Sequence, residues 1–429
     1  MGMIEITTDK IYNFSNMIKK VWYMEQLLII DPIGCKWLVL EKKQEPVFDA
    51  LNSGNTIEMV LERFEEETVV ETVLQIEAKQ FGDGICKFDQ GLNLFIYLTN
   101  RCNLKCRHCY MYSGDKLTDE LPVEEWIRVL KEFKDIGGEG VTFSGGEVAL
   151  YEGFIEIIKA CNKLGLLVTV LTNGTLWDKK TIAEIAELVD EIQISLDGYN
   201  DDSYSSVRGA RLYNSVIATI EQFAQTNIRV SVAVTPLYDN LDDFIKEFKF
   251  VALELIKKHA NVFIKVNLEL ISGRDIEVCK SENAKYKKKL KKMVNDIYPN
   301  YYIENFAINY DGHMGMNNCG YGGITLASDG SVYWCNRIFE MKSEVSVLRM
   351  NLREVYEMSK QVKKKMHVDN IRPCNNCEIK YICGGGCRLK YKEVFDKENK
   401  IQYIAECDKL YKASFYEKMI LSNEYFFVE

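Results

Sequence analysis

Ten of the fourteen cysteines in this 429-residue chain stand in two groups of regular spacing, and this spacing constrains the chain more than any other feature. The first group has the pattern Cys-x3-Cys-x2-Cys and consists of Cys102, Cys106 and Cys109. The second group consists of Cys319, Cys335, Cys374, Cys377, Cys383, Cys387 and Cys407. Disulfides are rare in a reducing compartment, so cysteines at such spacings indicate metal binding or redox chemistry.

The start of the chain and its charge give the expected compartment and partners. The first ten residues include Glu5 and Asp9 and no basic stretch before an apolar run, so we expect no signal peptide and a cytoplasmic protein. No apolar run approaches the roughly 18 residues of a membrane span, so we expect no membrane partner. The chain has 54 Lys and Arg against 63 Asp and Glu, and this net charge of −9 disfavours a nucleic-acid partner.

From Leu92 onward, short strand patterns alternate with helical patterns. We expect strands at residues 92–98, 141–143, 167–171, 192–196, 229–234 and 262–268. The intervening helices are expected at residues 123–136, 154–164, 182–189, 215–224 and 241–256. This alternation predicts an α/β fold with a parallel sheet, two units short of a closed eight-stranded barrel. Polar residues follow the carboxyl ends of the strands, where barrels of this kind build their active sites.

The first cysteine group directly follows the first of these strands. Three thiolates can hold three irons of a cubane iron–sulfur cluster, which leaves the fourth iron free for another ligand. A structural zinc site usually needs four protein ligands. His108 is next to Cys109, and adjacent positions make simultaneous ligation of one zinc ion awkward. We therefore favour an iron–sulfur cluster with one open iron.

The segment from Cys102 to Cys109, together with Gly145-Gly146-Glu147 at the next strand end, resembles the radical S-adenosylmethionine (radical SAM) superfamily. The resemblance implies a partial (β/α)6 barrel of the TIM type. It also implies a [4Fe–4S] cluster on the first cysteine group, whose open iron chelates SAM. Reductive cleavage of SAM would then give a 5′-deoxyadenosyl radical that abstracts a substrate hydrogen, with flavodoxin or ferredoxin as the kind of electron donor.

The same resemblance implies contacts to SAM at the strand ends. The residues concerned are Gly145, Gly146, Glu147, Asn173, Ser195, Asp197 and Arg208. A guanidinium suits the SAM carboxylate because it can bind a carboxylate with two parallel hydrogen bonds. For the other residues, turn formation is the alternative explanation, since Asn, Asp, Ser and Gly all favour turns.

The second cysteine group allows two interpretations. Four of its members match a zinc ribbon, namely Cys374, Cys377, Cys383 and Cys387, but that leaves three cysteines unexplained. All seven together resemble the SPASM extension of radical SAM enzymes, which implies a loop-rich domain with two auxiliary [4Fe–4S] clusters and thus three clusters in all. The resemblance assigns one auxiliary cluster to Cys374, Cys377, Cys383 and Cys407, and the other to Cys319, Cys335 and Cys387.

Seven thiolates leave one of the eight auxiliary irons without a cysteine. His313 and Cys279 are weak candidates for the missing ligand. An open iron has affinity for thiolates, so a substrate cysteine bound there could be joined to a carbon radical. Asn336 stands where sulfatase-maturing relatives carry an aspartate base, and this argues against oxidation to formylglycine.

Residues 1–88 resemble the winged-helix-like domain with which peptide-maturing SPASM enzymes recognise a leader peptide. A strand is expected there at residues 37–40, and Asn55 with Glu58 forms a capping-box pattern before a helix. We expect three domains: this module at residues 1–88, the radical SAM core at 89–275, and a bridging helix with the SPASM domain at 276–429.

The whole organisation resembles the sactipeptide and ranthipeptide maturases, which install thioether bridges in ribosomally made peptides. The expected partner is therefore a precursor peptide with a leader sequence. The alternatives are a carbon–carbon crosslinking enzyme, a sulfatase maturase, and a non-enzymatic zinc protein that contacts DNA. No residue stands out as a catalytic acid or base. Four cysteines fit no motif and are expected to be structural, namely Cys35, Cys86, Cys161 and Cys279.

Overall fold

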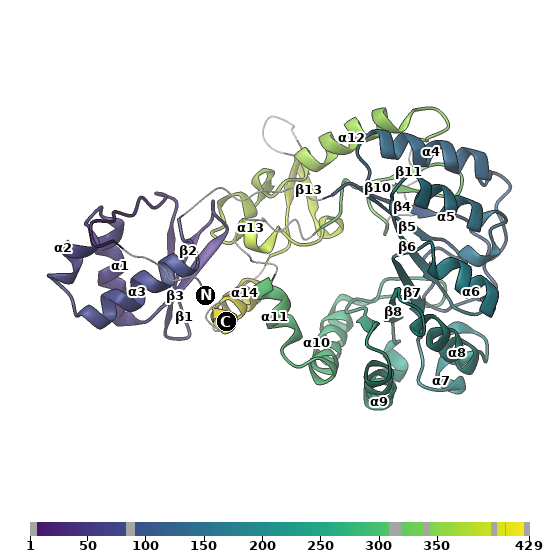
Figure 1. Ribbon diagram of the computed structural model, residues 1–429, viewed down its shortest axis with the longest axis horizontal. Helices are drawn as coiled ribbons and strands as arrows, with labels where there is room; N and C mark the ends of the chain where they lie inside the picture. The colour runs from purple at the N-terminus through teal and green to yellow at the C-terminus, as the bar shows by residue number, and fades with distance from the viewer. Residues whose placement is uncertain are drawn as a thin grey trace. The chain divides into compact units, whose positions relative to one another are not determined.

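The computed structural model of the chain describes residues 7–82, 91–308, 319–337, 344–395, 401–407 and 409–423. These residues form two compact units, each built from segments that are far apart in sequence (Figure 1). Unit 1 comprises Met1–Gln90, Asn300–Tyr321 and Lys363–Glu429, and unit 2 comprises Gly91–Pro299 and Gly322–Val362. Two residues named above, Cys86 and His313, lie outside the described residues. The division into three domains stays a prediction.

Unit 2 is built on an eight-stranded sheet with the order β11-β10-β4-β5-β6-β7-β8-β9. Its parallel part consists of β4 (Asn93–Tyr97), β5 (Gly140–Ser144), β6 (Leu167–Thr172), β7 (Glu191–Ser195), β8 (Arg229–Val234) and β9 (Val262–Val266). These are the six strands predicted from the sequence, with ends shifted by at most two residues. The prediction of an α/β fold with a parallel sheet is confirmed.

Helices connect the parallel strands of unit 2. They are α4 (Val123–Asp135), α5 (Phe154–Lys163), α6 (Lys179–Ala186), α7 (Asp201–Arg208), α8 (Tyr213–Ala224), α9 (Leu241–Lys258) and α10 (Lys280–Ile297). Figure 1 shows α4, α5, α6 and α8 along one face of the curved sheet. Their apolar sides pack on the strands in one core, in which Trp126 and Phe143 are fully buried. This arrangement leaves the carboxyl ends of the strands free to form a site.

A segment from late in the sequence extends the sheet beyond β4. The strand β10 (Ile324–Leu326) pairs in parallel with β4, and β11 (Val332–Tyr333) pairs antiparallel with β10. The helix α12 (Leu352–Lys365) follows. The hairpin therefore brings Cys335, which lies two residues beyond β11, to the edge of the barrel strands.

The N-terminal part of unit 1 is a three-stranded antiparallel sheet followed by three helices. The elements are β1 (Lys19–Tyr23), β2 (Gln26–Asp31), β3 (Lys36–Leu40), α1 (Glu45–Asn52), α2 (Ile57–Leu61) and α3 (Glu66–Ala78). Of the strands, only β3 was predicted. The helix α2 is capped by Thr56, whose side chain accepts from the Met59 amide at 3.2 Å, so the predicted capping box of Asn55 and Glu58 is wrong.

The strands β2 and β3 of this sheet are buried on both faces, whereas the edge strand β1 is largely exposed. One face packs on α1 and α3 through residues such as Leu27 and Leu38. The other face, with Leu28 and Trp37, packs on segments from the other end of the sequence. The Trp37 indole donates to the Met419 carbonyl at 3.0 Å. The N-terminal module therefore shares a core with the C-terminal part of unit 1.

The C-terminal part of unit 1 has few regular elements. They are α11 (Tyr301–Ile308), β12 (Ile371–Arg372), α13 (Lys380–Cys383), β13 (Lys392–Phe395), β14 (Ile401–Ile404) and α14 (Lys409–Leu421). The short strands form a sheet in the order β12-β14-β13. Most of the second cysteine group lies in the loops and short turns between these elements.

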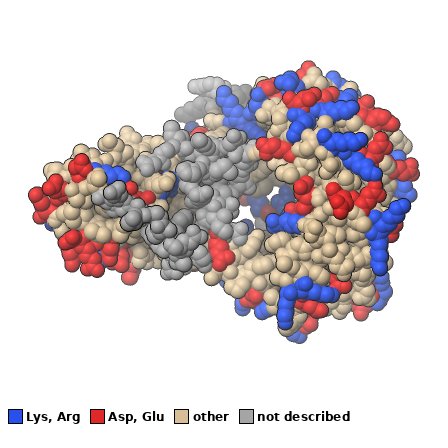
Figure 2. Space-filling model, in the orientation of Figure 1, with Lys and Arg blue, Asp and Glu red and all other residues tan. Residues whose placement is uncertain are grey.

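The surface of the N-terminal module is acidic over α2 and α3. Figure 2 shows acidic side chains gathered at this end of unit 1, and the exposed glutamates there are Glu58, Glu62, Glu65, Glu66 and Glu67. Such a surface repels phosphates, which disfavours the DNA-contacting alternative. No helix in the described part of the chain is both long enough and apolar enough to span a membrane.

Candidate active site

A cavity of about 240 Å³ lies at the carboxyl ends of the parallel strands in unit 2, and we call it the strand-end cavity. Eight of the residues predicted for the SAM site line it, namely Cys102, Cys106, Cys109, Gly145, Gly146, Asn173, Ser195 and Arg208. Glu147 and Asp197 are not part of its wall. These eight residues come from the ends of four strands and from the helix α7, and more than 100 positions separate the first from the last in the sequence.

The three cysteines of the first group sit in a loop tied to its surroundings by backbone hydrogen bonds. The Cys102 amide donates to the Gly114 carbonyl at 2.8 Å, and the Cys109 amide to the Cys106 carbonyl at 3.2 Å. Burial raises the pKa of Cys102 to about 11 and also raises that of Cys106. Without metal these two side chains are neutral thiols at pH 7, so the binding of iron must displace their protons.

Gly145 and Gly146 allow the loop after β5 to approach the cysteine loop closely. A Cβ atom on Gly145 would lie 2.5 Å from the Thr99 carbonyl oxygen, and one on Gly146 would lie 2.3 Å from the Arg101 carbonyl oxygen. Both contacts are with backbone, which cannot move aside as a flexible side chain can. Glycine is therefore required at both positions for the backbone of this loop to line the cavity.

The Glu147 side chain turns away from the cavity and braces its wall. The carboxylate is 1% exposed and accepts from the Thr172 hydroxyl at 2.6 Å and the Asn173 amide at 2.7 Å. It also accepts from the Ala149 amide at 3.2 Å. These bonds hold the end of β6, from which Asn173 reaches the cavity. A direct contact between Glu147 and SAM stays a prediction.

A buried network connects Arg208 to the cysteine loop. Its Nη2 lies 2.5 Å from Asp197 Oδ2, and its Nη1 donates to the Cys106 sulfur at 3.6 Å. Burial alone would lower the Arg208 pKa, but the charges of Asp197 and Cys106 outweigh burial and raise the pKa above its ordinary value. Arg208 is therefore a permanent cation, balanced by Asp197 and placed against a cysteine sulfur.

His108 belongs to the same network. Its Nε2 lies 3.3 Å from Asp197 Oδ2, and burial lowers its pKa to about 4, so the imidazole is neutral at pH 7. A neutral ring has one N–H, and the carboxylate can only accept, so Nε2 carries the proton and Nδ1 is an acceptor. Asp197 also accepts from the Thr235 amide at 2.6 Å. Asp197, which does not itself line the cavity, therefore fixes the positions of three wall residues: His108, Arg208 and Thr235.

Two buried nitrogen atoms of this network have no hydrogen-bond partner among the described residues. They are Nε of Arg208 and Nδ1 of His108, and both residues line the strand-end cavity. Buried polar atoms are nearly always paired, so an unpaired donor and an unpaired acceptor in one cavity wall indicate a polar ligand. A small molecule with both a carboxylate and donor groups would satisfy both atoms.

The cavity wall also includes residues that were not predicted as SAM contacts. Among them are Tyr97, His108, Tyr110, Gln193, Thr235 and Asn267. Alternation along the strands could have found two of them, because side chains two positions apart point to the same face. Gln193 precedes Ser195 by two positions, and Thr235 follows Ala233, another wall residue, by two.

The second cysteine group is divided between the two units. In unit 1, the Cys387 side chain hydrogen-bonds to Cys319 and lowers the pKa of Cys319 to about 5. Burial, together with the nearby thiols of Cys383, Cys377 and Cys407, raises the pKa of Cys374 to about 12. Cys335 belongs to unit 2. The structure thus brings together the four cysteines that the resemblance assigns to one auxiliary cluster.

Among the described residues, no group of three or more His, Cys, Asp or Glu side chains is placed to hold one metal ion. The zinc ribbon and the two auxiliary iron–sulfur clusters both stay predictions.

Three of the four cysteines outside the motifs can be placed. Cys35 and Cys161 are buried, as expected of structural cysteines. Cys279 is exposed at the start of α10, so its prediction as a packed apolar residue is wrong. A hydrogen bond with the Ser281 hydroxyl, at 3.0 Å, lowers the pKa of Cys279.

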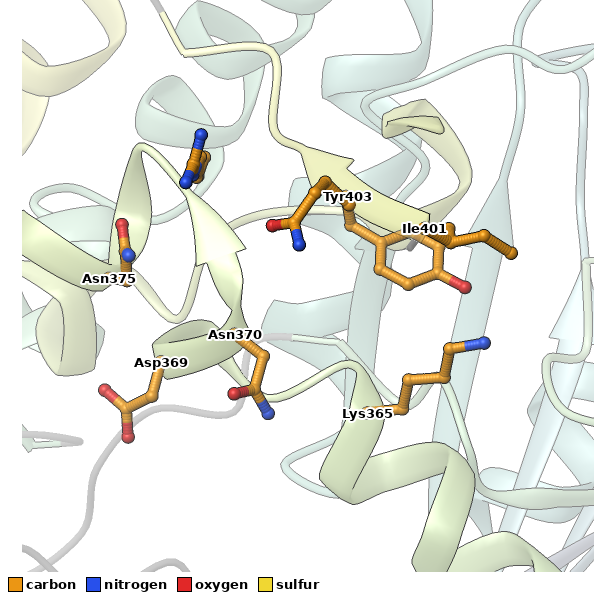
Figure 3. Close-up of a pocket in the computed structure, with 8 residues that line it drawn as sticks. Lys365, Asp369, Asn370, Asn375, Ile401 and Tyr403 are labelled. Atoms are coloured by element: carbon orange, nitrogen blue, oxygen red, sulfur yellow. The ribbon is translucent and has the colours of Figure 1, made fainter. Parts of the chain in front are cut away.

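A second hollow, of about 370 Å³, lies in unit 1 beside β12 and β14 (Figure 3). Its lining consists of Lys365, Asp369, Asn370, Arg372, Asn375, Ile401, Gln402 and Tyr403. The Asp369 carboxylate is engaged by Lys380 at 2.6 Å and by the Tyr381 hydroxyl. No cysteine lines this hollow. The chemistry indicated by the first cysteine group therefore belongs to the strand-end cavity, which these three cysteines line.

Comparison with known proteins identifies the domain that carries the strand-end cavity. Residues 96–251 match the family model described as the radical SAM superfamily. The sporulation killing factor maturation protein SkfB of Bacillus subtilis is 34% identical over 150 residues, covering 34% of this chain and 36% of SkfB. GTP 3′,8-cyclase of Clostridium perfringens is 31% identical over 170 residues, covering 38% of this chain and 51% of the cyclase. The chain thus spans about a third to a half of the length of these curated relatives.

A solved structure extends the likeness to most of the chain. The structure of native anSMEcpe with bound AdoMet and Cp18Cys peptide has a TM-score of 0.55 and 18% sequence identity. The match covers 79% of this chain and 98% of anSMEcpe. At this identity the comparison shows that the two proteins share a fold.

A radical SAM domain implies one [4Fe–4S] cluster and SAM, and the strand-end cavity fits both. Three thiols in its wall supply the ligands for a cluster with one open iron. The unpaired nitrogens of Arg208 and His108, and the glycine backbone after β5, supply polar partners for SAM. The family match and this fit together identify residues 96–251 as a radical SAM domain.

Proposed function

We propose that this enzyme joins a cysteine sulfur to a carbon atom within a ribosomally made precursor peptide. The observation that carries the proposal is the presence of a second, seven-cysteine group in the same chain as the strand-end cavity. The relative named as a maturation protein and the solved structure with a bound peptide support a peptide substrate. Other relatives, such as the cyclase, have different names, so the radical SAM domain alone does not decide the reaction.

In the proposed reaction, the strand-end cavity starts the chemistry. The cluster and SAM, when bound there, supply a 5′-deoxyadenosyl radical that takes a hydrogen atom from a substrate carbon. The Arg208 guanidinium and the backbone of Gly145 and Gly146 orient the polar end of SAM. Asp197 and Glu147 keep the wall rigid from behind, through the contacts described above.

The second cysteine group would complete the bond. We assign Cys374, Cys377, Cys383 and Cys407 to one auxiliary cluster and Cys319, Cys335 and Cys387 to the other, which leaves one iron open for the substrate thiolate. Per bridge, the peptide loses one hydrogen atom from carbon and one proton from the thiol. Formation of the carbon–sulfur bond would release one electron, which an auxiliary cluster held by these cysteines would accept.

Replacing Cys319 or Cys335 by alanine should stop bridge formation while SAM cleavage continues within about tenfold of the wild-type rate. The reason is that neither residue lines the strand-end cavity. Bridges are counted by mass spectrometry of the peptide, and 5′-deoxyadenosine by chromatography. If both variants still form bridges at the wild-type rate, the substrate thiolate does not bind an open iron held by these cysteines.

The sulfatase-maturase alternative is less well supported. It requires a carboxylate base at the position of Asn336, and an amide side chain cannot take a proton in that role. The Asn336 side chain faces the neighbouring Cys335 thiol, at 4.0 Å. Asn336 therefore gives the chain no base of the kind that formylglycine formation needs.

The N-terminal module would bind the leader of the precursor. We propose that the leader adds a strand to its sheet, since main-chain hydrogen bonds at a sheet edge give affinity with little demand on sequence. The strands β1 and β3 are the two edges, because each pairs only with β2 among the described strands. The module shares a core with α13 and α14, so its deletion would expose Trp37 and Leu28 and is a poor test.

Hydrogen exchange gives a better test of the leader proposal. A leader-bearing peptide should slow amide exchange severalfold along β1 or β3 of the intact enzyme, because the added strand would form hydrogen bonds with the backbone of the edge strand. A peptide of the same composition in scrambled order is the control. Protection confined to the barrel strands, with β1 and β3 unchanged, would contradict the assignment of this module.

A further inference from the structure

Two tyrosines join the wall of the strand-end cavity to the segment that carries Cys335. Tyr97 ends β4 and is 1% exposed, and Tyr110 directly follows the third cysteine of the first group. Both line the cavity. The Tyr97 hydroxyl donates to the Asn336 carbonyl at 2.6 Å, and the two hydroxyl oxygens are 2.7 Å apart.

The direction of these hydrogen bonds follows from the groups involved. A carbonyl oxygen can only accept, so Tyr97 uses its single proton on Asn336. In the contact between the tyrosines, Tyr110 must therefore be the donor. The result is an ordered chain from Tyr110 to Tyr97 to the backbone of Asn336.

This chain is the short connection between two positions that the sequence separates by 226 residues, Cys109 and Cys335. Tyr110 is covalently next to Cys109, and Asn336 is covalently next to Cys335. Two hydrogen bonds and the two tyrosine side chains connect the Cys109 loop to the Cys335 segment. The Cys335 thiol is also close enough to act electrostatically on both tyrosines.

The pairing of β10 with β4 brings this segment to the barrel but does not hold Asn336 itself. The ladder between β10 and β4 ends at Leu326, and the pairing of β11 ends at Tyr333. The residues after Tyr333 leave the sheet. The Tyr97 hydroxyl contacts Asn336, three positions after Tyr333, where no sheet hydrogen bond holds the backbone.

We propose that Tyr97 and Tyr110 are positioning residues that fix the Cys335 segment against the radical site, so that the two reaction centres keep a constant separation. The role assigned to Cys335 rests on the proposed function. The contact itself does not, since it concerns residues of unit 2 alone. Radical chemistry gives this contact a purpose, because a carbon radical and its sulfur partner must meet in near-attack geometry.

The test compares three tyrosine-to-phenylalanine variants of the iron-loaded enzyme. Tyr97→Phe removes the donor to Asn336 and keeps the buried ring. Tyr110→Phe removes the outer hydroxyl and leaves the bond to Asn336 in place. Tyr112→Phe is the matched control, because Tyr112 lies in the same loop, is 61% exposed and does not line the cavity.

Hydrogen exchange of residues 333–337 and the EPR spectrum of the reduced enzyme are the readouts. Tyr97→Phe should speed exchange of this segment roughly two- to tenfold, the effect of losing one hydrogen bond, and Tyr110→Phe should have a smaller effect. The auxiliary-cluster signal should change in Tyr97→Phe while that of the SAM cluster stays. Bridges formed per SAM cleaved should fall by a similar factor, with an unchanged unfolding temperature.

Exchange and EPR spectra that are the same in Tyr97→Phe and Tyr112→Phe would overturn the inference. A uniform rise in exchange over the whole barrel would also overturn it, since that would be general destabilisation. Failure of the proposed function can be distinguished from failure of this inference, because the wild-type enzyme would then form no bridge. In that case faster exchange at residues 333–337 in Tyr97→Phe would still support the positioning contact.

Discussion

Replacing Cys102, Cys106 and Cys109 together by alanine should abolish release of 5′-deoxyadenosine, while iron bound by the second cysteine group remains. The strand-end cavity takes its iron ligands from these three thiols, and alanine offers no ligand in their place. The nucleoside is measured by chromatography after anaerobic incubation with SAM and a reductant. Bound iron is measured separately by metal analysis and EPR.

The matched control is Cys279→Ser, which changes an exposed cysteine outside both groups. It should leave nucleoside release and iron content unchanged. Release of 5′-deoxyadenosine by the triple alanine variant would contradict the SAM site assigned here. Loss of all iron from that variant would mean that the second cysteine group does not hold clusters of its own.

Replacing Arg208 by methionine should lower the free energy of unfolding of the barrel by about 3–5 kcal/mol. The substitution leaves the Asp197 carboxylate, which is 1% exposed, without the cation beside it. It also removes the donor to the Cys106 sulfur and the unpaired Nε in the cavity wall. SAM affinity should therefore fall along with stability. Denaturant unfolding under anaerobic conditions and equilibrium binding of SAM measure the two effects.

A double variant separates the two consequences. Arg208→Met combined with Asp197→Asn removes the cation and the charge it balances, so most of the lost stability should return while SAM affinity stays low. Arg211→Met is the control, because Arg211 pairs with Asp202 on the surface, and exposed pairs contribute about 1 kcal/mol or less. An Arg208→Met variant as stable as Arg211→Met would contradict the buried network.

The barrel strands could be predicted because each is a short apolar run that ends in turn residues. The carboxyl ends of parallel strands meet at one edge, so the residues after them could also be expected to share a site. Gly145, Asn173 and Ser195 do so. The sequence could not show that Asp197 and Arg208 pair with each other, because that depends on how α7 returns to the end of β7. Helix α7 itself was missed because it has few apolar residues.

The strands β1 and β2 were missed for a different reason. The turn between them is formed by Met24 and Glu25, which have positive φ angles of 49° and 64°. Tight hairpins usually place Gly, Asn or Asp at such positions, and their absence removed the usual signal. In β2, five consecutive buried residues end at Asp31, so no alternation marks it as a strand.

Contacts between segments that are distant in sequence could not be predicted from local sequence patterns. The pairing of β10 with β4 joins residues more than 200 positions apart. The bond between Tyr97 and Asn336 depends on that pairing. The regular spacing of the second cysteine group predicted a metal site, but it carried no information on which thiols approach one another.

The most direct test of the central claim is mass spectrometry of a small cysteine-containing precursor peptide after anaerobic co-expression with this enzyme. The intact mass is combined with a count of thiols that react with an alkylating agent under reducing conditions. Thioether formation predicts the loss of two hydrogen atoms per bridge and one unreactive cysteine for each bridge. Loss of two hydrogen atoms with every thiol still reactive would contradict it and establish a carbon–carbon crosslink instead.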